Sequence, residues 1–363
     1  MSSDLGASSE TRSGADMALL GACPLPLTNY KEIVLAHGSG GKLSHQLITK
    51  MVLPQFRNAI LEPLHDGAMF SLGNRRIAFS TDSYVVSPIF FPGGDIGKLA
   101  INGTVNDLAM CGARPLYLSA GFILEEGTSM EDFWRILQSM REAAHSAGVQ
   151  LVTGDTKVVD RGKADKIFIN TSGIGLIPDG VNIHPNRVQI GDKILISGPI
   201  AVHGIAIMSV REGLEFETEI ASDTAALNGL VETIFAASND VHVLRDPTRG
   251  GVTSALTEIA QTAKVGMLLD EARIPISEEV KGACEILGLD PLYVANEGKL
   301  LALIPTRDAE TVLAAIRTHP LGHGAAIIGE VVEDHPTCVM LKTRVGGTRI
   351  VDMLSGEQLP RIC

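Results

Sequence analysis

The last residue of the sequence carries a thiol, and its position is the most distinctive chemical feature of the chain. Cys363 closes the segment Pro360-Arg361-Ile362-Cys363. A terminal cysteine can enter a narrow site, where its thiolate would be the nucleophile. A prenylation signal would need the cysteine at Pro360, so the remaining alternative is a cysteine without a function. The 12 residues from Asp352 span roughly 40 Å when extended, enough to reach both a distant partner and an internal site.

Carboxylates recur at expected strand ends and turns, where they could bind a metal ion. They are Asp66, Asp82, Asp107, Asp155 and Asp246, and Asn106 stands beside Asp107. Mg²⁺ prefers hard oxygen ligands and bridges to nucleotide phosphates, so several of these carboxylates together would make a Mg–ATP site. For any single aspartate, capping a helix or closing a turn is the alternative role. The hypothesis therefore depends on the whole set.

A glycine loop precedes an expected helix over residues 43–51. In His37-Gly38-Ser39-Gly40-Gly41-Lys42 the backbone N–H groups around Gly40 and the amine of Lys42 could hold phosphates. The segment is not a Walker A loop, because Ala36 stands where that motif needs glycine and Leu43 where it needs Ser or Thr. A plain glycine turn is the alternative.

Three further segments combine charged residues with turns. In Gly154-Asp155-Thr156-Lys157 an amine stands beside an expected metal ligand. The segment 246–251 (Asp-Pro-Thr-Arg-Gly-Gly) joins a strand to a helix N-terminus, a favourable place for an anion. Glu297, in the segment 296–299, precedes a strongly apolar strand and is a candidate base. A solvated surface lysine and an ordinary loop carboxylate are the alternatives for Lys157 and Glu297.

Both halves of the chain must supply strands and helices to position these residues. Apolar periodicity predicts strands in the first half over 75–82, 115–124, 149–152 and 167–177, and helices over 94–110 and 130–147. Thr128 or Ser129 would cap the helix over 130–147. In the second half the predicted strands are 192–199, 241–246, 300–304 and 325–332, and the predicted helices are 201–211, 252–263 and 308–318.

Turn residues over 178–187 divide the two halves, which predicts two domains. The predicted fold class is α+β (mixed α/β), with mixed sheets and flanking helices in each domain. The predicted organisation is a disordered extension over 1–29, an N-terminal domain over 30–178, a second domain over 187–351 and an exposed, mobile tail over 352–363.

Composition limits the class of protein. The 363 residues are 45% apolar and 20% charged, as expected of a globular chain with a sizeable core. A net charge of −12 without a Lys/Arg cluster argues against nucleic-acid binding. No segment is long and apolar enough to span a membrane, and the run before Cys23 is too short for a lipoprotein signal. Five scattered cysteines without a CxxC pair favour a reducing, cytoplasmic compartment.

Taken together, these motifs resemble the HypE family of hydrogenase maturation factors. That family belongs to an ATP-binding superfamily with aminoimidazole ribonucleotide synthetase and selenophosphate synthetase. The resemblance runs from about His37 to Cys363, and the terminal Pro-Arg-Ile-Cys is specific to HypE. The segments that carry it are 37–42, 79–82, 102–109, 154–157, 246–251, 296–298 and 360–363.

The resemblance implies a fold, partners and a reaction. The N-terminal domain would form an intersubunit β-barrel in a homodimer, with ATP beside the interface. Cys363 would receive a carbamoyl group from the carbamoyltransferase HypF, and ATP would drive dehydration of this thiocarboxamide to a thiocyanate. The HypC–HypD complex would accept the cyanide for iron of the nickel–iron hydrogenase centre.

The reaction requires Mg–ATP, an in-line carbamoyl oxygen and a base. The expected metal ligands are Asp82, Asp107 and Asp155, with Cys363, Lys157 and Glu297 as the reacting or orienting groups. Glu297 is preferred as the base, because lysine would need a much lowered pKa. The residues expected to bind the nucleotide are Gly40, Lys42, Asp66, Asp82, Asn106, Asp107, Gly154, Asp155 and Thr156.

Two rival functions remain open at this point. One is a kinase-like enzyme that acts on a free small molecule, for which Cys363 would be incidental. The other is a scaffold without catalytic activity that binds ATP and hands over a cyanide made elsewhere.

Overall fold

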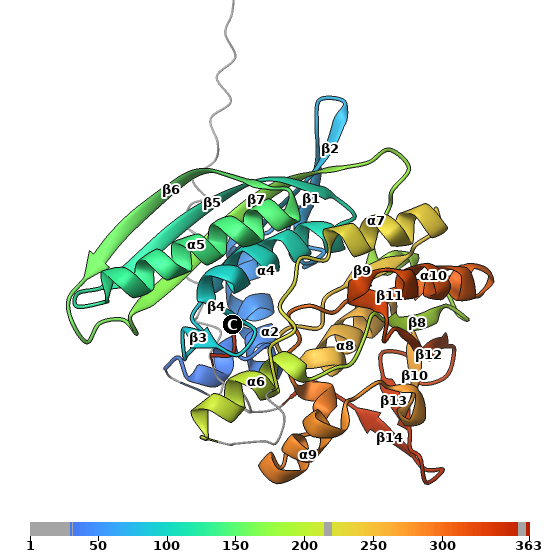
Figure 1. Ribbon diagram of the computed structural model, residues 1–363. Coiled ribbons are helices and arrows are strands. Elements are labelled where there is room, and N and C mark those ends of the chain that lie inside the picture. The colour runs from blue at the N-terminus through green and yellow to red at the C-terminus, as the bar shows by residue number, and fades with distance from the viewer. Residues whose placement is uncertain (1–29, 31, 214–219, 355–360) are drawn as a thin grey trace, which may run out of the picture.

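The computed structural model describes residues 30, 32–213, 220–354 and 361–363. Within these residues two large β-sheets lie side by side, each flanked by helices (Figure 1). Both sheets contain parallel and antiparallel neighbours. The predicted class, mixed α/β with two mixed sheets and flanking helices, is confirmed. The predicted disordered extension over 1–29 lies outside the described residues.

The first sheet has five strands in the order β1-β2-β7-β5-β6. Its neighbours are antiparallel except β5 and β6, which run parallel. Helices α4 and α5 lie along one side of it (Figure 1). The bounds are β1 Ala68–Leu72, β2 Arg75–Tyr84, β5 Arg114–Glu125, β6 Gln150–Val159, β7 Ile167–Ile177, α4 Ile96–Met110 and α5 Met130–Ala147; β3 (Phe90–Phe91) and β4 (Gly94–Asp95) form a separate short pair.

Side-chain caps explain where the two helices of this half begin. Asp95 accepts hydrogen bonds of 2.7 and 3.0 Å from two backbone N–H groups in the first turn of α4. Ser129 accepts a backbone hydrogen bond at the start of α5, and Gly148 ends that helix in the left-handed conformation. The predicted helix over 130–147 is therefore confirmed, and of the two predicted caps, Thr128 and Ser129, it is Ser129 that caps it.

The other face of the first sheet carries apolar side chains in contact with solvent. No helix among the described residues packs against this face. Phe79, Ile174 and Tyr117 form one cross-strand row over β2, β7 and β5. They are 41%, 40% and 43% exposed, respectively. A contiguous apolar row on a sheet is typical of an interaction surface.

The second sheet has seven strands in the order β14-β13-β10-β12-β8-β11-β9. Its strands are β8 Lys193–Ile196, β9 Val243–Arg245, β10 Gly266–Asp270, β11 Leu301–Ile304, β12 Ala326–Val332, β13 Val339–Lys342 and β14 Thr348–Val351. The helices of this half are α6 Val202–Arg211, α7 Asn228–Ala237, α8 Gly251–Ala263, α9 Glu278–Leu287 and α10 Thr306–Thr318.

Alternation along β8 shows how the second sheet is covered on both faces. Ile194 and Ile196 belong to the core shared with α6, α8 and α9. Leu195, which points the other way, belongs to the core shared with α7 and α10. Strands buried on both sides are continuously apolar, which explains the run in β11.

Several boundaries differ from the prediction. The strand predicted over 149–152 continues through Val159, because β5 supplies pairing partners along its whole length. The segment 154–157 therefore lies within a strand and not in a turn. The helix predicted over 43–51 is divided into α2 (Lys42–Leu47), a π-helical turn and α3 (Leu53–Phe56). The short elements β1, β10, β13, β14, α7 and α9 were not predicted.

The end of the chain folds back onto the first half. The prediction of an exposed tail is wrong for its last two residues, since Ile362 and Cys363 are 3% and 5% exposed. They pack with the core of the first sheet. Among the described residues, no helix has the length and apolar character needed to cross a membrane.

Candidate active site

A cleft of about 1070 Å³ lies between the two halves of the chain, and both contribute to its walls. The walls include the glycine loop, the ends of β2 and β9, the start of α8 and the terminal cysteine. Six of the predicted site residues line it: Gly40, Asp66, Asp82, Asp107, Glu297 and Cys363.

Carboxylates from both halves meet in this cleft. Asp107, on α4, accepts a hydrogen bond of 2.6 Å from Ser80 on β2. Burial raises the pKa of Asp107 well above its ordinary value, and the charges of Asp246 and Asp82 raise it further. Burial also raises the pKa of Asp246 to about 6, although Arg245 opposes the change. The cleft therefore concentrates negative charge that a bound cation would relieve.

Asp66 is held by a buried ion pair. Its Oδ1 lies 2.7 Å from Nε of Arg245, which also donates to Glu258. Burial alone would lower the pKa of Arg245, but Asp66 and Glu258 outweigh it and raise this pKa above its ordinary value. The second oxygen of Asp66, Oδ2, is buried and has no hydrogen-bond partner among the described residues. One oxygen thus remains for a ligand.

Glu297 presents a second unpartnered oxygen to the cleft. The side chain is buried, and its Oε1 has no hydrogen-bond partner in the described part of the chain. Burial raises the pKa of Glu297 well above its ordinary value, and the nearby charges of Asp246 and Asp82 act in the same direction. A carboxylate with a raised pKa is a stronger base than an ordinary carboxylate.

Cys363 reaches the same cleft from the opposite end of the sequence. Arg249 Nη1 donates a hydrogen bond of 3.1 Å to its sulfur. The same nitrogen lies 3.8 Å from Asp82 Oδ1. Burial raises the pKa of the Cys363 thiol to about 12, Arg249 opposes this change, and Glu297 and Asp82 add to it. The structure therefore brings the predicted nucleophile, base and acidic residues to one place.

The glycine loop packs against the turn that carries Arg249. Gly40 has φ +76°, and a Cβ there would lie 2.5 Å from the Cβ of Arg249, so only glycine fits. The side chain of Lys42 forms an ion pair of 2.6 Å with Asp352 and does not line the cleft. Its predicted contact with phosphates stays a prediction.

Asn106 contacts protein groups in this structure, and its predicted contact with the nucleotide stays a prediction. It is buried, and its amide group bridges α4 to the segment before α7. Nδ2 donates to the carbonyl of Ala225 at 3.0 Å, and Oδ1 accepts from Leu227 N at 2.8 Å. Because both ends of the amide are occupied, it holds the two halves together and does not line the cleft.

Gly154, Asp155, Thr156 and Lys157 also lie outside the cleft of their own chain. Asp155 shares a cross-strand row with Asn170 and Ser83, on the uncovered face of the first sheet. Asp82 is adjacent to Ser83 in β2, so it points to the opposite face. Lys157 is two residues beyond Asp155 and pairs with it at 2.6 Å. The structure does not bring this pair to Asp82 and Asp107 within one chain.

The acidic residues fit a divalent metal in chemistry but do not form a closed site. No group of three or more His, Cys, Asp or Glu side chains among the described residues stands close enough to hold a metal ion. The unpartnered Asp66 Oδ2 and the crowded carboxylates offer the hard oxygen ligands that Mg²⁺ uses when phosphates complete its shell.

Three charged or ionisable residues of the cleft wall could not be picked out from the sequence. They are His65, Arg245 and Glu258. Burial lowers the pKa of His65 to about 3, with the charge of Arg245 adding to the effect, so this imidazole is neutral. Arg249 stood in a recognised motif but had no assigned role. The sequence signal that Arg245 offers is a charged residue at the end of an otherwise apolar strand.

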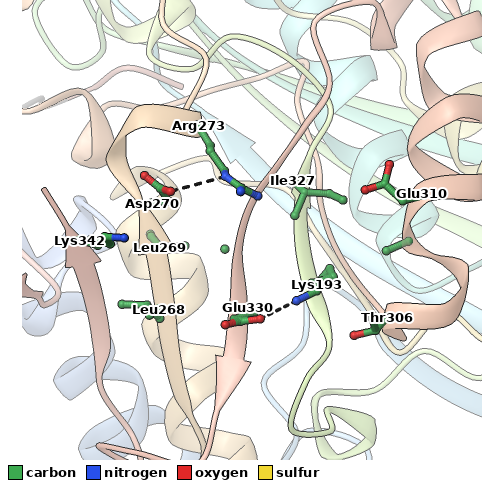
Figure 2. Close-up of a pocket in the computed structure, with 12 residues that line it drawn as sticks. Lys193, Leu268, Leu269, Asp270, Arg273, Thr306, Glu310, Ile327, Glu330 and Lys342 are labelled. Carbon is green, nitrogen blue, oxygen red and sulfur yellow. Dashed lines mark hydrogen bonds and ion pairs between the residues drawn. The ribbon is translucent and has the colours of Figure 1, made fainter. Parts of the chain in front are cut away.

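A second hollow lies against the second, seven-stranded sheet and contains none of the predicted site residues. Figure 2 shows charged side chains from β8, β10, β12 and α10 around it. Lys193 pairs with Glu330 at 2.5 Å, and Arg273 with Asp270 at 3.5 Å. These two ion pairs engage four of the charged side chains, and none of the predicted site residues lies here, so we take the cleft as the candidate active site.

Comparison with known proteins first identifies the class. The family model "AIR synthase related protein, N-terminal domain" matches residues 64–177, and the model of the corresponding C-terminal domain matches residues 189–341. Together the two models cover most of both halves, and the chain belongs to the AIR synthase related family.

The chain is also similar to particular members of that family. It is 54% identical to carbamoyl dehydratase HypE of Azotobacter vinelandii over 331 residues, 91% of this chain and 97% of the relative. A HypE–HypF complex matches with a TM-score of 0.81 and 48% identity, covering 85% of this chain and 99% of the solved one. HypE in complex with ATP matches with a TM-score of 0.78 and 50% identity, covering 92% and 100%. The chain belongs to the HypE family of carbamoyl dehydratases.

Proposed function

We propose that the chain uses ATP to dehydrate a carbamoyl group carried on its own Cys363, in the maturation of nickel–iron hydrogenase. The observation that carries this proposal is the burial of the Cys363 sulfur in the acid-lined cleft, 3.1 Å from Arg249 and beside Glu297. The solved relative bound to ATP supports the choice of nucleotide.

The reaction converts Cys363–S–C(=O)–NH₂ and ATP to Cys363–S–C≡N, ADP and phosphate. The carbamoyl oxygen attacks the γ-phosphorus, and the P–O bond to ADP breaks. The C–O bond then breaks, and the oxygen leaves within phosphate. The two N–H protons are lost to bases, which completes the nitrile. An amide oxygen leaves poorly by itself, so its transfer to phosphate is the reason that ATP is needed.

Glu297 is the proposed base for an N–H proton. Its unpartnered Oε1 faces the cleft that holds the Cys363 sulfur. Burial raises the pKa of Glu297, which makes its carboxylate a stronger base than an exposed one. Arg249 would orient the sulfur-linked group and balance charge around the phosphate.

Nucleotide phosphates would lie near Gly40 and the acidic residues of the cleft wall. We propose Asp66, Asp82 and Asp107 as carboxylates that face Mg²⁺ when ATP is bound, with Asp155 from the uncovered sheet face. The metal would neutralise phosphate charge and favour transfer to the carbamoyl oxygen. Asn106 would act only by holding α4 in place.

We further propose that the chain forms a homodimer through the uncovered face of the first sheet. The exposed row of Phe79, Ile174 and Tyr117 supports this, because two such faces would bury apolar surface in an intersubunit β-barrel. In such a dimer, Asp155 and Lys157 would lie at the interface. Asp155 and Lys157, together with Gly154 and Thr156, would then line the cleft of the partner subunit.

The proposed partners follow from the same chemistry. A HypE–HypF structure supports HypF as the donor of the carbamoyl group. The HypC–HypD complex is the proposed acceptor of the cyanide. Domain division at 178–187, a mobile tail over 352–363 and a cytoplasmic location belong to the same proposal.

Intact mass of the C-terminal peptide tests the function. The protein is incubated with HypF, carbamoyl phosphate and Mg–ATP, with Glu297→Gln beside it. The wild type should gain one carbamoyl group and then lose one water only when ATP is present. The variant should gain the carbamoyl group but dehydrate it about 10²–10⁴-fold more slowly.

The rival functions predict other results. ATP consumption that needs a small metabolite and survives Cys363→Ala would indicate a kinase acting on a free substrate. A carbamoylated tail that never loses water would leave only a scaffold. Dehydration at the normal rate in Glu297→Gln would exclude Glu297 as the base.

A further inference from the structure

The backbone of the last three residues lies against the segment that follows β2. Val85 N donates to the main-chain oxygen of Cys363 at 3.0 Å, and Ser87 N donates to the carbonyl of Arg361 at 3.3 Å. His203 Nε2 donates to the carbonyl of Ile362 at 3.0 Å. These bonds use only main-chain oxygens of the tail, so they would accept almost any terminal sequence.

Selectivity must therefore come from side chains, and the side chain of Arg361 contacts three separate groups. Its Nη2 lies 2.7 Å from Asp165 Oδ2, as a close ion pair without hydrogen-bond alignment. Its Nε donates to the carbonyl of Val85 at 3.0 Å, and its guanidinium lies 5.9 Å from the ring centre of Phe168. Three different groups thus hold one side chain.

The backbone of Arg361 supports the same interpretation. Its φ is +53°, in the left-handed region that non-glycine residues rarely adopt. Such a conformation persists only where surrounding contacts compensate for it. The contacts of the Arg361 side chain are well placed to do this, because they fix both ends of the guanidinium.

A second arginine, Arg211, lies close to Arg361. Arg211, at the end of α6, donates to the carbonyls of Ser87 and Arg361. Its positive charge lies close enough to that of Arg361 to lower the pKa of Arg211, after the larger effect of burial. Asp165 is the carboxylate that pairs with Arg361, so it offsets the repulsion between the two guanidinium groups.

We propose that Arg361, Asp165 and Arg211 form a tail latch that recognises the terminal segment and sets how much of the time Cys363 occupies the cleft. Arg361 is then a specificity residue of the tail, and Asp165 and Arg211 are positioning residues. Asp165 lies in the loop between β6 and β7, and β6 carries Lys157. The latch therefore connects the tail to the loop that follows β6, the strand whose Lys157 is proposed to reach the partner cleft.

Alkylation of the purified full chain by iodoacetamide, without ATP, tests the latch. Cys363 is buried when the tail is docked, so its rate of modification reports release. Asp165→Asn should raise this rate about fivefold, the effect expected for a partly exposed ion pair. Asp165→Glu should restore slow modification. Asp160→Asn, on the same loop and exposed, is the matched control and should leave the rate unchanged. Cys284, buried elsewhere, reports general unfolding.

An unchanged Cys363 rate in Asp165→Asn would overturn the latch, as would an equal rise at Cys284 or in Asp160→Asn. The expected effect of the latch on catalysis rests on the proposed function. A second measurement therefore tests the latch and the function separately. In Asp165→Asn, carbamoylation by HypF should be as fast as in the wild type or faster. ATP-dependent dehydration should be about fivefold slower. Failure of dehydration in the wild type, with the alkylation pattern intact, would remove the function and leave the latch.

Discussion

Arg249 Nη1 lies 3.1 Å from the sulfur of Cys363, although the two residues are 114 positions apart in the sequence. The same nitrogen is 3.8 Å from Asp82 in the first sheet. Arg249 thus joins the end of the chain, the second half and the acidic wall of the cleft. It is the cation best placed to hold a sulfur-linked carbamoyl group against a negatively charged nucleotide.

Replacing Arg249 by glutamine should slow ATP-dependent dehydration of the carbamoylated tail by about 10²-fold, the usual effect of losing one preorganised donor in an active site. Lysine at this position should give an intermediate rate, because it keeps the charge and loses the planar fork. Single-turnover mass spectrometry of the C-terminal peptide measures both. Arg273→Gln, in the hollow of Figure 2, is the control and should leave the rate unchanged. A normal rate in Arg249→Gln would contradict the assignment.

Mixed dimers should show whether Lys157 serves the partner's cleft. A dimer of one Lys157→Ala chain and one Glu297→Gln chain contains one cleft with both residues intact if Lys157 acts across the interface. Dehydration should then recover to about half of the wild-type rate per dimer. If Lys157 acted within its own chain, both clefts would be defective and the mixed dimer would stay inactive. Tandem affinity tags isolate the mixed species for the assay.

The row of Phe79, Ile174 and Tyr117 should control the oligomeric state. Ile174→Asp places a charge in the middle of the apolar face, which should convert the proposed dimer to monomer and weaken ATP turnover. Light scattering during size-exclusion chromatography measures the mass. Ile286→Asp, at an exposed position on α9, should have no such effect. A wild-type protein that is already monomeric would refute the interface.

Ionisation of Asp246 should destabilise the protein when no nucleotide is bound. Burial raises the pKa of this carboxyl from 3.8 to about 6 in the folded chain. The folded state therefore holds the proton more tightly than the unfolded state. This contribution to stability is present below pH 3.8 and is lost as the pH rises through about 6.

Asp246→Asn cannot ionise at this position. Its free energy of unfolding, relative to the wild type, should therefore increase by up to about 3 kcal/mol between pH 4 and 7. Urea unfolding at several pH values measures the difference. A difference that does not change with pH would show that Asp246 keeps an ordinary pKa in the folded chain.

Local sequence determined much of the secondary structure. The helix over 130–147 and the strand over 167–177 depend on apolar spacing and on neighbouring cap or turn residues, so their bounds could be predicted. The motifs around Asp82, Glu297 and Cys363 could also be singled out, because carboxylates stand at the ends of expected strands and a thiol stands at the last position. Short elements such as β13 and β14 could not, since four residues carry too little periodicity.

The tertiary structure decided which of these residues meet. Asp82 and Asp155 look alike in the sequence, yet strand alternation and sheet order place them on opposite faces. Asn106 is predicted from the sequence to bind the nucleotide, and only the structure shows that the segment before α7 contacts its amide. The contact between Arg249 and Cys363 depends on how the last residues lie against the segment after β2. The pattern of residues in a sequence predicts relationships between positions only a few residues apart. An active site is assembled by the packing of distant segments, and that packing is set by the fold as a whole.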